Sequence, residues 1–68
     1  MNKGNHGTYT FTITQEDGSY IVRCIHSDGD ELESAWTSCP TREEAELNAR
    51  SRALTLSGQT TARVRCDF

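Results

Sequence analysis

Polar and apolar residues alternate strictly along residues 8–14, where threonines separate three large apolar side chains. A period of two predicts a strand with one buried face. The Asp17-Gly18 pair that follows is the preferred turn of a two-residue hairpin, so residues 20–26 are expected to form the return strand. Counting outward from this turn brings the apolar residues of both strands onto one face. The pairs on that face are Tyr9 with His26, Phe11 with Cys24, and Ile13 with Val22.

Three further elements follow the hairpin. Residues 32–39 form a shorter third strand. Thr41, with Glu44 three residues later, is a capping box that begins a helix, and Gly58 is placed to end that helix. Residues 60–68 alternate again and predict a last strand.

These elements predict an α+β fold in the order β-β-β-α-β. A helical connection returns the last strand to the same sheet with a right-handed crossover. We therefore expect a four-stranded, mostly antiparallel sheet in the order 3-2-1-4, with one helix on one face. Residues 1–7 are rich in Gly and Asn and are expected to form a flexible leader, whereas residues 8–68 form a single small domain.

The predicted helix carries two apolar stripes. At about 100° per residue, small and apolar residues share one side that fits closely onto a sheet. These residues are Ala45, Ala49, Ala53 and Leu56. Leu47 and Leu54 fall on nearly the opposite side of the helix. Three interpretations stay open: an exposed patch, a contact with a partner, or a helix that buries the leucine side instead of the alanine side. The two leucines are our second-choice interface.

The helix covers one face of the predicted sheet and leaves the other face open. This open face carries Thr10, Thr12, Thr14, Ile21, Arg23, Ile25, Arg63 and Arg65. Guanidinium and hydroxyl groups are suited to phosphate contacts, and exposed isoleucines favour a protein contact. The candidate contact residues are Arg23, Arg63, Arg65, Ile21 and Ile25. Three uses of the face stay open: a protein partner, a nucleic acid, or the solubility that charged side chains give to an exposed sheet.

Composition narrows these alternatives. The chain has 68 residues, 34% of them hydrophobic, which allows one thin core and excludes a second domain or a deep cofactor cleft. Its net charge of −3 disfavours bulk nucleic-acid binding. The sequence lacks a membrane-spanning apolar run and a signal peptide, so we expect no membrane association and a cytoplasmic location.

The sequence shows no catalytic or metal-binding motif. Its three cysteines are widely spaced, without the CxxC of metal or redox pairs. We expect three small thiols that are buried or half-buried: Cys24 and Cys66 alternate onto the core face, and an exposed Cys39, just before Pro40, is the alternative for the third. His26 falls at a strand end beside an aromatic residue, which is typical of a packing role. We therefore predict no catalytic residue, no cofactor and no metal ion.

Two stretches of the chain carry a family resemblance. They are Gly18-Ser19-Tyr20-Ile21-Val22 at the start of the second strand, and Thr41-Arg42-Glu43-Glu44-Ala45 with Asn48-Ala49 in the helix. With them, residues 9–54 resemble the N-terminal domain of HicB-like antitoxins, although residues 24–28 lack the proline-containing run of that family. The resemblance implies a partial ribonuclease-H-like fold without its active site. It also implies a domain that binds and blocks a toxin protein.

We therefore expect a small, non-enzymatic protein-binding module, antitoxin-like or encoded by a mobile element as a regulator. The alternative is a small RNA- or DNA-binding protein that uses the arginines of the open face. The thin core and the uncovered sheet favour a homodimer over a monomer. Its contact is expected on the open face or at the outer edge of the last strand.

Overall fold

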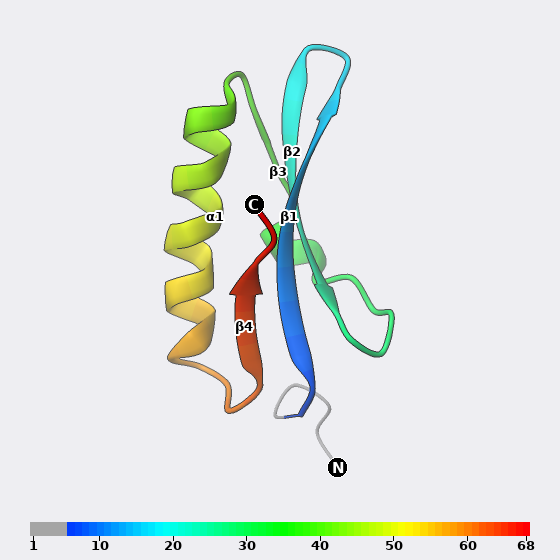
Figure 1. Ribbon diagram of the computed structural model, residues 1–68, viewed down its shortest axis with the longest axis vertical. Helices are drawn as coiled ribbons and strands as arrows, with labels where there is room; N and C mark the ends of the chain where they lie inside the picture. The colour runs from blue at the N-terminus through cyan, green and yellow to red at the C-terminus, as the bar shows by residue number, and fades with distance from the viewer. Residues whose placement is uncertain (1–5) are drawn as a thin grey trace.

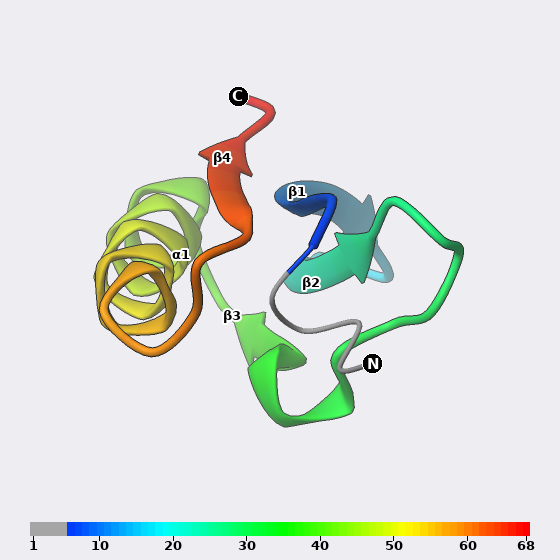
Figure 2. The ribbon, with the colours of Figure 1, turned by 90° about the horizontal axis from the view of Figure 1, so that it is seen from below.

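The computed structural model describes residues 6–68 and confirms the predicted α+β fold (Figure 1). The strands are β1 (Thr8–Glu16), β2 (Ser19–His26), β3 (Thr37–Cys39) and β4 (Arg63–Cys66). They form one sheet in the order β3-β2-β1-β4, as expected. The helix α1 (Arg42–Ser57) lies against one face of this sheet (Figure 2). Residues 1–5 of the predicted leader lie outside the described residues.

The register of the β1–β2 hairpin is the predicted one. Phe11 stands opposite Cys24, and Ile13 stands opposite Val22. Asp17 and Gly18 have φ angles of 50° and 79°, which is the backbone of a type I′ turn. This turn twists in the same sense as the strands, so the local sequence determines both the bend and the pairing.

The third strand is shorter than residues 32–39, and that prediction is wrong at its start. A 3-10 turn, η2 (Glu33–Ala35), occupies the first part of the segment. Its backbone bonds run from the Ala35 N–H to the Leu32 carbonyl and from the Trp36 N–H to the Glu33 carbonyl. The turn places Ala35 in the core with 4% of its surface exposed, so burial of a small residue outweighs continued pairing.

The last strand is also shorter than the predicted range 60–68. The Ala62 N–H donates to the Thr60 hydroxyl at 3.1 Å, a local turn that competes with strand pairing. From Arg63 onward the chain pairs with β1 in parallel. The pairing continues one residue past the strand, because the Asp67 N–H donates to the Phe11 carbonyl at 2.9 Å.

The helix begins and ends where the sequence predicts. Thr41 is the N-cap, and its hydroxyl accepts the Glu44 N–H at 3.2 Å. Gly58 ends the helix, but with a right-handed φ of −79° rather than the left-handed conformation of many glycine caps. Ala45 and Ala49 are completely buried, so the alanine stripe faces the sheet.

The core lies between this alanine stripe and one face of the sheet. Because the small helix side chains let the backbone approach closely, the strands supply most of the core volume. The buried hydrophobic residues of the cluster are Phe11, Val22, Cys24, Ala35, Cys39, Ala45 and Ala49.

Candidate functional site

Ile21 is less accessible than the sequence predicts. It lies on the open face opposite Thr14, yet only 6% of its surface is exposed. Arg23 and Glu16 flank this pair in the register, and the Arg23 Nη2 lies 3.4 Å from the Glu16 Oε2. The two charged side chains therefore span the Ile21 position. The expectation that Ile21 is an exposed contact residue is wrong.

Arg23 is directed toward the hairpin turn and away from the other two arginines. Its side chain is 37% exposed, and its Nε is buried without a hydrogen-bond partner among the described residues. Its guanidinium group forms an ion pair with Glu16. Arg23 is thus paired near the hairpin turn and is not part of the depression around Arg63 and Arg65.

The other predicted residues of the open face meet around Thr10. In the register Thr10 stands between Ile25 on β2 and Arg65 on β4, and Arg63 stands opposite Thr8. Ile25 is 39% exposed. The two arginines and two threonines, with Ser27, line a shallow depression. The structure therefore brings Arg63 and Arg65 together, and Ile25 lies on the other side of Thr10.

The second apolar stripe of α1 faces solvent. Leu47 is 64% exposed and Leu54 is 78% exposed, the two largest values among the big apolar side chains described. The sequence left three interpretations of this stripe, and the structure excludes a wrongly chosen buried side. Two exposed leucines two helical turns apart remain available for a contact.

Leu54 also borders a groove between α1 and β4, which we call the edge groove. It encloses about 340 Å³ and is lined by Arg50, Ala53, Leu54, Ser57, Val64 and Cys66. The guanidinium carbon of Arg50 lies 5.1 Å from the centre of the Phe68 ring, a cation–π contact. The sequence analysis missed Arg50, although its position one turn before Leu54 on the helix places it beside that residue.

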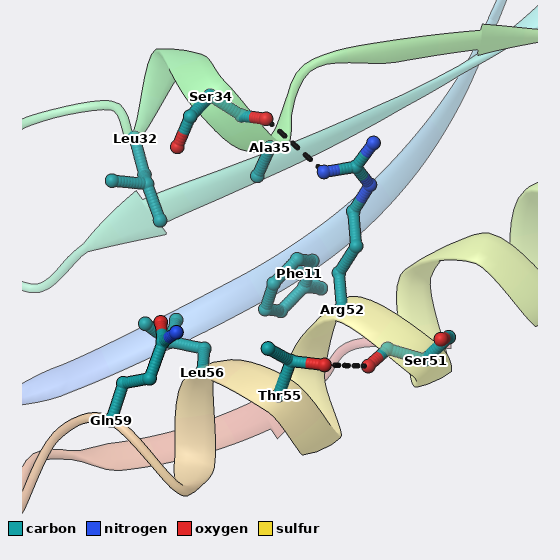
Figure 3. A pocket seen from close by; sticks show the side chains of 9 residues that line it. All are labelled: Phe11, Leu32, Ser34, Ala35, Ser51, Arg52, Thr55, Leu56 and Gln59. Carbon is teal, nitrogen blue, oxygen red and sulfur yellow. Dashed lines mark hydrogen bonds between the residues drawn. The ribbon is translucent and has the colours of Figure 1, made fainter.

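A second pocket opens between α1 and η2 (Figure 3). Phe11, Leu32 and Leu56 give it an apolar floor, and Arg52 reaches across its mouth. The Arg52 Nη1 donates to the Ser34 carbonyl at 3.2 Å, so the guanidinium group is held there. Its volume of about 240 Å³ is below the range of about 300–1,000 Å³ that is usual for ligand pockets.

His26 is buried, with 6% of its surface exposed, and packs edge-on against Tyr9 with ring centres 4.7 Å apart. Its Nε2 lies 2.5 Å from the His6 carbonyl oxygen, and its Nδ1 accepts the Asp28 N–H at 3.2 Å. The same Nδ1 lies 3.0 Å from the Asp28 Oδ1, so both the backbone and the carboxylate of Asp28 contact the ring. A Cβ at Gly7 would lie 2.4 Å from the Ser27 Oγ, so this contact between the chain start and the turn after β2 requires glycine.

The cysteines face the core. Cys24 is fully buried, and burial raises the pKa of its thiol from 9.0 to about 11, with a smaller contribution from Cys66. Cys39 is 7% exposed, so it is buried as expected, and the alternative of an exposed Cys39 is excluded. It lies on β3 opposite Tyr20, where the strand packs beneath the helix. All three thiols are free.

Comparison with known proteins gives no match to a family model, a curated protein or a solved structure. Within residues 6–68, no helix has the length and apolar character to cross a membrane. In the same part of the chain, no three side chains of His, Cys, Asp or Glu lie together as metal ligands would.

Proposed function

We propose that this chain is a non-enzymatic protein-binding module that acts in the cytoplasm by capturing and blocking a partner protein. The observation that carries the proposal is the exposure of Leu47 and Leu54 on the outer side of α1. Single exposed leucines are ordinary on protein surfaces. Here the two lie two turns apart on the outer side of one helix, and Leu54 also borders the edge groove, so both can contact the same partner.

The resemblance of the hairpin and helix motifs to HicB-like antitoxins suggests the class of partner, a small toxin protein. The titratable groups agree with a role in binding rather than catalysis. The His26 ring is buried with both nitrogens in contact with polar atoms. The Cys24 thiol, with its pKa raised to about 11, holds little reactive thiolate at neutral pH.

Photo-crosslinking in the source cells tests the proposal. A crosslinking amino acid at Leu47 or Leu54 is expected to trap one protein partner, and the same amino acid at Glu43 serves as an exposed control on the helix. The trapped protein should bind the purified chain, and Leu47→Glu with Leu54→Glu should weaken that binding at least tenfold. Equal binding by the double variant would contradict the assignment of this surface.

A second candidate function, nucleic-acid binding, is favoured by one observation. Arg63 and Arg65 stand opposite Thr8 and Thr10 and line one depression, which offers cationic and hydroxyl groups to a phosphate backbone. Binding of this kind should weaken steeply between low and physiological salt and should depend on Arg63 and Arg65. A contact through the leucines should change little with salt.

Association with a second copy of the chain would use the same surfaces. Formation of the predicted homodimer would therefore compete with binding of a partner protein. Sedimentation over a hundredfold concentration range measures it directly, because a constant monomer mass at the highest concentration would remove the homodimer from the proposal.

A further inference from the structure

The outer edge of β4 presents backbone groups that the sheet does not use. β4 lies at one end of the strand order and pairs with β1 alone. The Arg63 N–H donates to the Gly7 carbonyl at 3.0 Å, and the Asp67 N–H donates to the Phe11 carbonyl. Backbone groups of successive residues in a strand point to opposite sides. The N–H and C=O groups of Val64 and Cys66 therefore point away from β1, the arrangement that accepts another strand.

The edge groove lies beside this row of backbone groups. Leu54 forms its outer wall from α1, while Val64 and Cys66 form its inner wall from β4. The side chains of a strand added here would alternate between the α1 side and the open-face side. Side chains on the α1 side would meet Leu54, and those on the other side would meet Arg63 and Arg65.

The charge around this edge is positive, although the chain has a net charge of −3. Arg50 and Arg65 have side chains that are 58% and 62% exposed. Their carboxylate neighbours, Glu46 and Asp67, are each 3.9 Å away. Exposed ion pairs at such distances contribute little free energy, so the two guanidinium groups can exchange these neighbours for the carboxylates of a partner.

The same charges disfavour a second copy of the chain at this edge. Antiparallel pairing of β4 with itself, centred on Val64, would set Arg63 opposite Arg65. Centring the pair on Arg65 would set that residue opposite its own copy, whereas only centring it on Cys66 would set Arg65 opposite Asp67. Like charges directly opposite one another destabilise a sheet. An extended acidic segment is the complementary occupant.

We propose that the outer edge of β4 binds an extended acidic segment of a partner protein by strand addition. The backbone of the segment bonds to Val64 and Cys66, its apolar side chains pack on Leu54, and its carboxylates lie beside Arg63 and Arg65. Main-chain bonds supply affinity in this mode of recognition, and the alternating side chains supply specificity. The proposal rests on the protein-binding function proposed above and names the chemistry of the segment that is bound.

The probe is a synthetic six-residue peptide in which Glu and Val alternate. Its binding is measured by the changes in amide chemical shifts of the full chain when the peptide is added. The amides of Val64 and Cys66 should shift most, because they form the new bonds. The same peptide methylated on alternate backbone nitrogens should bind at least tenfold more weakly, and a Lys-Val peptide should bind more weakly still. Equal binding of the Lys-Val peptide, or shifts that avoid β4, would overturn the proposal.

A matched pair of variants tests the edge from the protein side. Val64→Pro removes an N–H that the β1–β4 ladder does not use, and Val64→Ala is its control for the lost side chain. The proline variant should lose peptide binding at least tenfold relative to the alanine variant, while the Asp67 amide keeps its native chemical shift. Equal peptide binding by the two variants would overturn strand addition.

Two further outcomes separate this proposal from the proposed function. If Val64→Pro keeps full affinity for the crosslinked protein partner, strand addition is overturned and the protein-binding function stands. If the wild-type chain is a dimer that Val64→Pro converts to monomer, the occupant of the edge is a second copy rather than an acidic segment.

Discussion

The β1–β2 hairpin and the β4 edge are built from the same kind of alternating sequence but differ in what they leave exposed. In the hairpin, every predicted cross-strand pair forms, and the Arg23–Glu16 pair spans Ile21 on the open face. β4 pairs on one side only and runs beside an exposed Leu54. The hairpin therefore contributes most to the stability of the fold, whereas the β4 edge carries the groups that we propose for binding, so stability and binding should respond to different residues.

The largest expected effect is a loss of core packing in the hairpin. Phe11 is 1% exposed, and Phe11→Ala should lower the free energy of unfolding by about 3–5 kcal/mol, measured in urea. Val64 is only half-buried, so Val64→Ala should lower it by about 1 kcal/mol. Since Phe11→Ala removes most of the stability of so small a domain, Phe11→Leu serves as a milder second variant. Equal losses at Phe11 and Val64 would contradict the contrast between the two regions.

The second effect is a loss of stability in alkali that depends on Cys24. The folded pKa of about 11 lies above the unfolded value of 9.0, so the thiol contributes stability that is complete below pH 9 and is lost as pH rises toward 11. The two-unit difference corresponds to about 2–3 kcal/mol. Unfolding of wild-type and Cys24→Ala proteins at pH 7 to 11 should show a steeper decline for wild type. Parallel pH profiles would contradict the buried position of this thiol.

The third effect compares two glycines, Gly18 in the hairpin turn and Gly58 at the end of the helix that leads to β4. Gly18 has a φ of 79°, and Gly18→Ala should cost about 1–2 kcal/mol because a Cβ disfavours that conformation. Gly58 has a φ of −79°, and an added Cβ would meet the Thr55 carbonyl at an ordinary 3.5 Å. Gly58→Ala should therefore be neutral or stabilising by about 0.5 kcal/mol. Thermal unfolding of both variants measures the difference, and a destabilised Gly58→Ala would contradict this account of the helix end.

The smallest expected effect on stability is at the proposed binding surface. Leu54 is 78% exposed, so Leu54→Glu should change the free energy of unfolding by less than about 0.5 kcal/mol. Leu56, on the buried stripe of the same helix, is the matched control and should be clearly destabilised by the same substitution. A large loss at Leu54 would mean that this side chain belongs to the core.

Local patterns predicted the fold more completely than the exposure of the candidate site residues. The hairpin register and the helix cap depend on residues close together in sequence, so Asp17, Gly18 and Thr41 were sufficient for both. The low exposure of Ile21 could not be predicted. Alternation gives the face on which a residue lies, but it does not show that the neighbouring Arg23 pairs with Glu16 across that face. Likewise Arg50 and Phe68 meet only after the helix and β4 pack together.

The most direct test of the open β4 edge is amide hydrogen exchange of the free protein at low concentration, read residue by residue along residues 63–67. The account predicts an alternating pattern. The amides of Arg63, Arg65 and Asp67, which face β1, should be protected like those of the hairpin, and the amides of Val64 and Cys66 should exchange rapidly. If the amides of Val64 and Cys66 were protected as strongly as those of Arg63, Arg65 and Asp67, the edge would already be covered in the free protein. That result would contradict the claim that the outer edge of β4 is open to another strand.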